Sequence, residues 1–259
     1  MSTTLRIEHD GPVASVWLDR PEVRNAMNGT LIRELAAAFG ALAGADGVRA
    51  IILGGSGKAF CAGADLAFMR EAADYTWAQN HADAAALADM LWAIYSCPVP
   101  VIARIHGDCY AGGLGLASVC DIRVVADAVT FSLSEARLGL LPATIGPYVV
   151  RALGEQASRR YFVTAERFGA TEAHRLGFVH ELASADTIDV KVDAIVQTLL
   201  ANGPAAVKAS KQLVKDLAGQ PLSPELRADT ARRIADIRAS DEGRAGVQSF
   251  LNKRPAPWQ

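Results

Sequence analysis

The sequence lacks several features that would place it in other classes of protein. Its 259 residues include only 4 cysteines, which form no C-x-x-C pair and stand at no zinc-like spacing from histidine. No apolar run approaches the length of a membrane span, and the N-terminus shows no secretory signal. We therefore expect free thiols in a reducing compartment, a cytoplasmic location, no bound metal and no membrane partner.

The sequence also lacks a strong net charge. Its 26 Lys and Arg residues nearly balance its 28 Asp and Glu residues, which gives a formal charge of −2. This balance favours neither nucleic acid nor an anionic surface, so we expect no nucleic-acid partner. Hydrophobic residues make up 51 % of the chain, and this composition is typical of a globular protein with a sizeable core.

Complete nucleotide-binding and nucleophile motifs are missing as well. The segment 54–58 lacks the earlier glycine and the following Ser or Thr of a phosphate-binding loop. Lys58 replaces the last glycine of a nucleophile elbow around Ser56. The segment 113–118 matches a dinucleotide fingerprint only in part and lies in mid-chain. None of these motifs indicates a function.

Strand-like and helical segments alternate through the first two-thirds of the chain. Strands are predicted over 13–18, 49–53, 99–105 and 122–125. Helices are predicted after the cap at Asn28 and over about 74–96. This alternation predicts an α/β fold. The last third changes to helices that start near Pro204, Pro224 and Asp241, so we expect a core of residues 1–199 followed by a helical region of residues 200–259.

Two loops of small residues are candidates for binding an oxygen that becomes negative. Ala62, Gly63 and Ala64 allow a ligand to approach the backbone closely, although Asp65 also suits a helix cap. Gly112 and Gly113 open a second helix, where free N–H groups and the helix dipole favour an anion. Two backbone N–H donors from separate loops are what an oxyanion hole requires.

A lone carboxylate follows the second loop. Glu135 could move a proton beside the oxyanion donors, which would suit enolate chemistry on an activated carbonyl. The spacing Ser132-x-x-Glu135 also matches a capping box, in which the carboxylate only satisfies a backbone N–H. The spacing alone leaves both interpretations open.

Taken together and in this order, these motifs resemble the crotonase superfamily, the enoyl-CoA hydratase/isomerase family. The matching segments are 18–21, 24–28, 57–66, 100–103, 107–113, 120–123, 131–140, 170–179 and 250–258. The resemblance implies a ClpP-like spiral of ββα units with a C-terminal helical region that assembles a homotrimer or a dimer of trimers. It also implies an acyl-CoA thioester substrate, with coenzyme A as part of the substrate and no separate cofactor.

The resemblance assigns roles by position. The backbone N–H groups of Ala64 and Gly112 match the oxyanion donors, and Glu135 matches the acid/base residue. The positions that match the binding of CoA and substrate are Arg24, Ala26, Ala62, Asp65, Leu66, Tyr110, Phe250 and Lys253.

Gly115 departs from the pattern of typical hydratases, which carry a second glutamate there. We therefore expect a 2-enoyl-CoA hydratase with a single glutamate, with a Δ3,Δ2-enoyl-CoA isomerase and a catalytically silent CoA-binding or assembly protein as alternatives. The segments 131–140, 147–154 and 159–167 also resemble bacterial methylglutaconyl-CoA and isohexenylglutaconyl-CoA hydratases of leucine and acyclic-terpene breakdown. A branched glutaconyl-CoA is therefore a candidate substrate, and its own carboxylate, or water held by the backbone, could replace the missing side chain.

Overall fold

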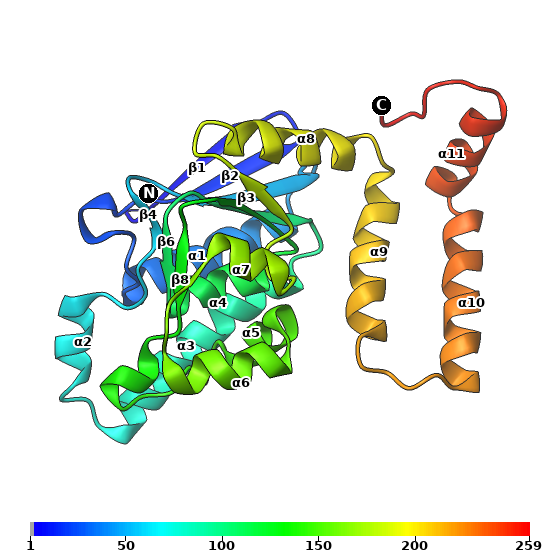
Figure 1. Cartoon of the computed structure of the whole chain (residues 1–259). Helices are drawn as coiled ribbons and strands as arrows, with labels where there is room; N and C mark the ends of the chain where they lie inside the picture. Colours follow the sequence, from blue (N-terminus) through cyan, green and yellow to red (C-terminus); the bar gives the residue numbers. More distant parts are fainter. Residues whose placement is uncertain (1–2) are drawn as a thin grey trace.

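The computed structural model describes residues 3–259 and contains two β-sheets surrounded by helices (Figure 1). The larger sheet has six strands in the order β1-β2-β3-β5-β7-β10. β1 pairs antiparallel with β2, and all other neighbours pair parallel. The strands are β1 (Leu5–Asp10), β2 (Val13–Leu18), β3 (Ala50–Gly55), β5 (Val101–Ile105), β7 (Ile122–Ala126) and β10 (Glu181–Ala183).

The smaller sheet repeats the order of the larger one. Its strands are β4 (Ala59–Cys61), β6 (Asp108–Tyr110), β8 (Thr130–Ser132) and β9 (Phe168–Gly169), in that spatial order. β4, β6 and β8 run parallel, whereas β9 is antiparallel to β8. Each of β4, β6 and β8 directly follows a strand of the larger sheet along the chain, so each unit contributes one strand to each sheet before its helix. The expected α/β class and its repeated ββα units are therefore observed.

Helices cover the two sheets. α1 (Gly29–Ala43) packs against α3 (Trp77–Ser96), α4 (Gly112–Val119) packs against β4 and β6, and α8 (Ile188–Leu200) packs against the larger sheet. The remaining helices of the body are α2 (Leu66–Ala72), α5 (Gly146–Leu153), α6 (Glu155–Thr164), α7 (Ala170–Arg175) and the short 3-10 helices η1 (Pro21–Val23) and η2 (Glu135–Leu138). Within residues 3–259, no helix is both long and apolar enough to cross a membrane.

Most of the predicted elements are present. β2 covers the predicted strand, and Asn28 caps α1 by accepting a hydrogen bond from the Leu31 N–H at 2.9 Å. β3 and β5 begin one and two residues later than predicted. The predicted loop before Asp65 contains β4, which the sequence pattern missed because a strand of 3 residues is too short to show alternation.

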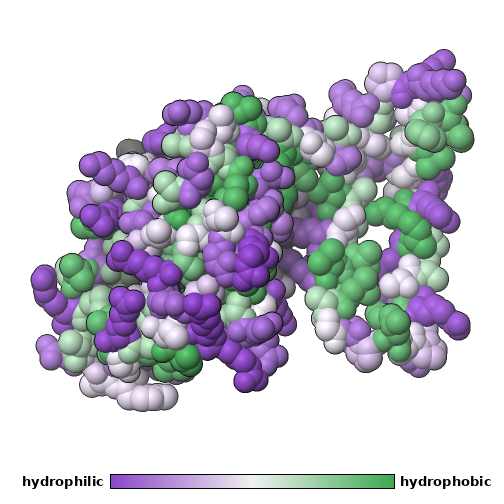
Figure 2. Space-filling model, in the orientation of Figure 1, coloured by the Kyte–Doolittle hydropathy of each residue, from purple (hydrophilic) through white to green (hydrophobic). Residues whose placement is uncertain are grey.

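The chain ends in an arm of three helices that extends from the body (Figure 1). These are α9 (Pro204–Leu217), α10 (Pro224–Ala239) and α11 (Asp241–Leu251), and all three start where the sequence predicted. Lys211 of α9 ties the arm to the body through an ion pair with Asp121 at 2.5 Å. Figure 2 shows apolar side chains gathered on the helices of this arm. The division into residues 1–199 and 200–259 stays a prediction.

Candidate active site

The ends of three neighbouring parallel strands bring the predicted catalytic residues together. β4, β6 and β8 lie side by side in the smaller sheet. The chain leaves these strands toward Ala64, Gly112 and Glu135, respectively. Because the carboxyl ends of parallel strands meet at one edge of a sheet, residues that are far apart in sequence converge there.

The backbone around Ala64 leaves one N–H group without a partner. Met27 donates to the carbonyl of Gly63 at 2.7 Å and accepts from the N–H of Asp65 at 2.9 Å. This parallel bridge points the intervening N–H of Ala64 away from Met27, and no described residue accepts a hydrogen bond from it. The Ala64 amide is therefore free to bind a ligand oxygen.

A second free N–H group lies at the start of α4. Ala111 has φ 47° and ψ −117°, which is a strained conformation for an alanine and turns the following peptide. Its own N–H donates to the carbonyl of Ser132 at 2.8 Å, which fixes the loop to β8. Gly112 is the first residue of the helix, and no described residue accepts from its N–H. This amide stands where the helix dipole favours a negative charge.

The glycine pair lets the start of α4 lie close to its neighbours, Gly113 against β4 and Gly112 against the side chain of Met27. A Cβ atom on Gly112 would lie 2.0 Å from Cε of Met27, and one on Gly113 would lie 2.4 Å from the carbonyl oxygen of Cys61. The glycine pair therefore allows close packing as well as an exposed amide.

Glu135 opens η2, and its carboxylate accepts a hydrogen bond from its own backbone N–H. Ser132 does not form the predicted capping box, because η2 begins only at Glu135 with Ser134 as its N-cap. The Ser132 hydroxyl donates to the carbonyl of Ala165 at 3.2 Å. Ser134 precedes η2 and makes no side-chain cap. Oε2 of Glu135 is buried and has no hydrogen-bond partner among the described residues. The predicted capping box is therefore absent, and Oε2 is available for chemistry.

One cavity of about 340 Å³ joins the three predicted catalytic residues. Apart from Glu135, no charged side chain of residues 3–259 lines it. Its other lining residues are Ala62, Ala64, Leu66, Met69, Leu87, Ala111, Gly112, Ser134, Leu138, Leu140, Leu141, Pro142, Ala143, Thr144 and Ile145. The cavity therefore combines two candidate oxyanion donors, one carboxylate and predominantly apolar walls.

The cavity makes Glu135 a stronger base than an ordinary glutamate. Burial raises the pKa of its carboxyl group above the ordinary value of 4.5, because the carboxylate loses hydration, and its own backbone N–H opposes this shift only in part. A carboxylate that binds protons more readily suits transfer to and from carbon or water.

We expect Glu135→Gln to raise the melting temperature at about pH 7 by about 1–3 °C, because it removes a partly desolvated charge that no cation pairs with. The pKa is higher in the folded than in the unfolded chain, so the wild type loses stability as the pH rises from about 4.5 through the folded-state pKa. Below that range the carboxyl group is protonated in both states, and the advantage of the variant should vanish. Thermal unfolding at about pH 4 and about pH 7 tests this; a variant less stable at pH 7 would show that the carboxylate has a stabilising partner.

The cysteines near the site are not nucleophiles. All four are buried and free. Burial raises the pKa of the Cys61 and Cys120 thiols to about 12, so almost no thiolate forms near neutral pH. Among residues 3–259, no cluster of His, Cys, Asp and Glu is arranged to hold a metal ion.

The structure places two of the predicted binding residues on the cavity and the others elsewhere. Ala62 and Leu66 line it. Asp65 caps α2 by accepting from the N–H of Ala67 at 2.8 Å, and it pairs with Arg20 at 2.8 Å. Its side chain therefore has a structural role as the helix cap that the sequence also allowed.

The remaining predicted binding residues lie away from the cavity. The Tyr110 hydroxyl bonds Thr130 at 2.6 Å instead of entering the cavity. Ala26 is buried and Arg24 is exposed near η1. Phe250 and Lys253 are exposed on the arm, where Phe250 is 83 % accessible. A role for these residues in binding CoA stays a prediction.

Sequence reasoning missed most of the cavity wall. The segment 138–145 supplies seven lining residues, including Ile145, and α2 and α3 add Met69 and Leu87. The exposed leucines 138, 140 and 141 after the turn at Gly139 are a signal that could have been noticed, because large apolar residues in a loop often mark a binding site.

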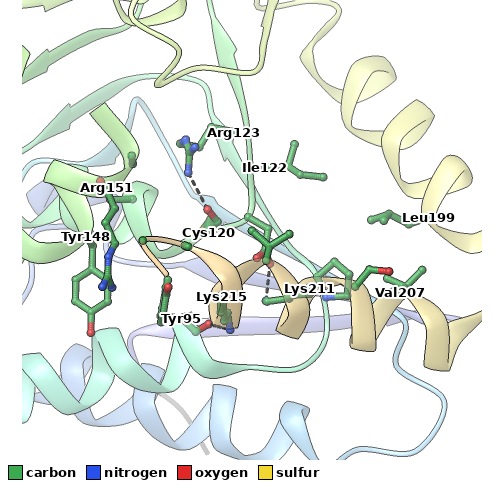
Figure 3. A pocket seen from close by; sticks show the side chains of 18 residues that line it. Tyr95, Cys120, Ile122, Arg123, Tyr148, Arg151, Leu199, Val207, Lys211 and Lys215 are labelled. Atoms are coloured by element: carbon green, nitrogen blue, oxygen red, sulfur yellow. Dashed lines mark hydrogen bonds and ion pairs between the residues drawn. The ribbon is translucent and has the colours of Figure 1, made fainter. Parts of the chain in front are cut away.

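A second groove of about 770 Å³ lies between α9 and the body. Figure 3 shows Lys211 and Lys215 entering it from α9, with Tyr148 and Arg151 on the opposite side. Lys215 lies 4.7 Å from the centre of the Tyr95 ring. The groove contains none of the predicted catalytic residues. It adjoins the C-terminal end of α4, whereas the catalytic cavity adjoins the N-terminal end of the same helix.

Comparisons with known proteins agree with this geometry. Residues 8–259 match the family described as Enoyl-CoA hydratase/isomerase. A protein of Rhodobacter capsulatus, named a probable enoyl-CoA hydratase, is 35 % identical over 255 residues, which cover 97 % of this chain and 96 % of that protein.

Two solved structures also superimpose over nearly the whole chain. An enoyl-CoA hydratase of Shewanella pealeana is 36 % identical with a TM-score of 0.96, covering 99 % of this chain and 96 % of that one. An enoyl-CoA hydratase of Mycobacterium smegmatis is 33 % identical with a TM-score of 0.93, covering 98 % of each chain. The chain therefore has the crotonase fold and belongs to the enoyl-CoA hydratase/isomerase family.

Proposed function

We propose that this enzyme adds water to a 2-enoyl-CoA with Glu135 as the single acid/base residue. One observation carries the proposal: a buried carboxylate oxygen without a partner, Oε2 of Glu135, shares a small cavity with the unpaired amides of Ala64 and Gly112. An acyl-CoA thioester supplies the oxygen that these amides would bind, and the family supplies the class of reaction.

The proposed reaction needs two proton transfers. The two amides hold the thioester oxygen while water attacks the β-carbon, and Glu135 takes a proton from that water. The electron pair of the double bond moves into the thioester, and its negative oxygen stays hydrogen-bonded to both amides. Glu135 then returns the proton to the α-carbon, so the elements of one water molecule are added. No electron acceptor is required, and we propose that no separate cofactor takes part.

The cavity lining favours an uncharged acyl group. Among residues 3–259, no Lys, Arg or His lines the cavity. A second carboxylate on the substrate would therefore meet Glu135, Ser134, Thr144 and apolar side chains, without a cation to pair with. Leu66, Met69 and Leu87 instead offer apolar surface to a hydrocarbon chain. A branched glutaconyl-CoA stays a candidate from the sequence, but this lining argues against it.

We expect kcat/KM for a straight-chain 2-enoyl-CoA to exceed that for methylglutaconyl-CoA by about tenfold or more, because burial of an unpaired carboxylate costs at least about 1–2 kcal/mol. A panel of CoA thioesters, followed by loss of the conjugated double bond and by mass spectrometry, measures this ratio. Faster turnover of methylglutaconyl-CoA would reverse the assignment of the acyl group. Absence of water addition to every member of the panel would overturn the proposed function itself.

A Δ3,Δ2-enoyl-CoA isomerase is the second candidate. It is favoured by the single carboxylate of the cavity, since one base can remove a proton from one carbon and return it to another. Product analysis separates the two reactions, because hydration gives a hydroxyacyl-CoA and isomerisation gives a shifted enoyl-CoA. A silent CoA-binding or assembly protein would turn over neither substrate.

We also propose a homotrimer or a dimer of trimers located in the cytoplasm. The apolar residues that the arm exposes include Val214, Leu222 and Leu251, which suit contact with another copy of the chain. In that assembly Phe250 and Lys253 could reach the CoA of a neighbouring subunit. Size-exclusion chromatography with light scattering measures the assembly directly, and a monomer at micromolar concentration would contradict it.

A further inference from the structure

Ile145 fills the space in front of Gly115. It directly precedes α5 and is only 2 % exposed, yet it lines the cavity that holds Glu135. A Cβ atom on Gly115 would lie 2.2 Å from Cγ2 and 2.8 Å from Cβ of Ile145. Cβ is fixed to the backbone, and a β-branched side chain has few alternative rotamers. Ile145 therefore fills the space into which any side chain at position 115 would point.

We infer that Ile145 is the specificity-determining residue that limits this cavity to one carboxylate. Gly115 alone would leave room beside the cavity for water or for an acidic side chain, but Ile145 closes that room with an apolar group. The polar side chains left along the cavity to hold the reacting water are those of Glu135, Ser134 and Thr144. This inference rests on the proposed function for its catalytic consequence but not for its packing.

The packing is tested by a double-mutant cycle in thermal unfolding, without any activity assay. Gly115→Ala is expected to lower the melting temperature by several degrees in the wild-type background, because the added methyl group overlaps Ile145. In the Ile145→Ala background the same change should cause little further loss. An equal loss in both backgrounds would show that Ile145 does not occupy this space.

The catalytic consequence is tested by introducing a second carboxylate. Gly115→Glu alone should lower stability without a gain in activity, since the glutamate cannot enter the cavity past Ile145. Gly115→Glu combined with Ile145→Ala should hydrate crotonyl-CoA about tenfold or more faster than Ile145→Ala alone. Gly40→Glu, at an exposed helix position with no atoms within 4 Å of an added Cβ, controls for the added charge.

Two results would overturn the inference. The first is Gly115→Glu folding normally and gaining as much activity as the double variant. The second is a folded double variant, as judged by its melting transition, that hydrates no faster than Ile145→Ala. Failure of the proposed function would look different, because the wild type would then hydrate no 2-enoyl-CoA while the stability cycle still showed coupling.

Discussion

Glu135→Gln is expected to lower kcat/KM for hydration of a 2-enoyl-CoA about 10³-fold or more. A positioned acid/base residue contributes roughly 10²–10⁴-fold to a reaction, and here one residue serves both proton transfers. The glutamine is nearly isosteric and cannot accept a proton at neutral pH. No second carboxylate lines the cavity to replace it. Steady-state kinetics on the most active thioester of the panel measures the loss.

Glu155→Gln is the matched control for this variant. Its carboxylate is 72 % exposed on α6 and pairs with Arg159 within one helical turn, an interaction that contributes little. The control should keep nearly all of the activity. If Glu135→Gln also stayed within about threefold of the wild type, general acid/base catalysis by Glu135 would be excluded.

Gly113→Ala is expected to lower kcat/KM about 10²–10³-fold, the range for loss of one oxyanion donor. The added Cβ would lie 2.4 Å from the carbonyl oxygen and 2.9 Å from Cβ of Cys61. Neither atom can yield without movement of β4, so α4 must shift away from that strand. This shift changes the separation between the amides of Gly112 and Ala64, which β4 and α4 hold in place. The same overlap should cost about 1–3 kcal/mol of stability.

Gly40→Ala tests whether this loss comes from position rather than from the type of substitution. Gly40 lies on an exposed face of α1, and an added Cβ meets nothing within 4 Å. Activity should be unchanged, and stability should rise by up to about 1 kcal/mol, because alanine favours a helix over glycine. Equal activity of Gly113→Ala and Gly40→Ala would show that the close approach of α4 to β4 does not position the oxyanion donors.

Local signals in the sequence were sufficient for the elements that carry the site. Asn28 and Pro204 mark helix starts through capping and a fixed φ, both of which are properties of single residues. Gly112 and Gly113 were recognisable as a candidate oxyanion site because a glycine pair at the start of an apolar helix exposes free backbone N–H groups. The family pattern then placed Ala64 and Glu135 with them, and the structure brings Ala64, Gly112 and Glu135 to one cavity.

Contacts between segments that are distant in the sequence could not be predicted in this way. The overlap between Gly115 and Ile145 depends on how α4 packs against α5, and no local pattern encodes it. Ser132 is spaced as a cap for Glu135, but its hydroxyl is used by Ala165, 33 residues later. The contact between the Tyr110 hydroxyl and Thr130 on the neighbouring strand was likewise not encoded in any local pattern. In each case tertiary packing decides which of several possible partners a side chain takes.

Isotope exchange tests the central claim, that Glu135 alone serves both proton transfers. The 3-hydroxyacyl-CoA product is incubated with enzyme in deuterated, ¹⁸O-labelled water, and mass spectrometry follows deuterium at the α-carbon and ¹⁸O at the β-carbon. The wild type should incorporate both labels, and Glu135→Gln should lose both together. Continued deuterium incorporation by Glu135→Gln after ¹⁸O incorporation has stopped would contradict the claim, because a second group would then be moving the proton at the α-carbon.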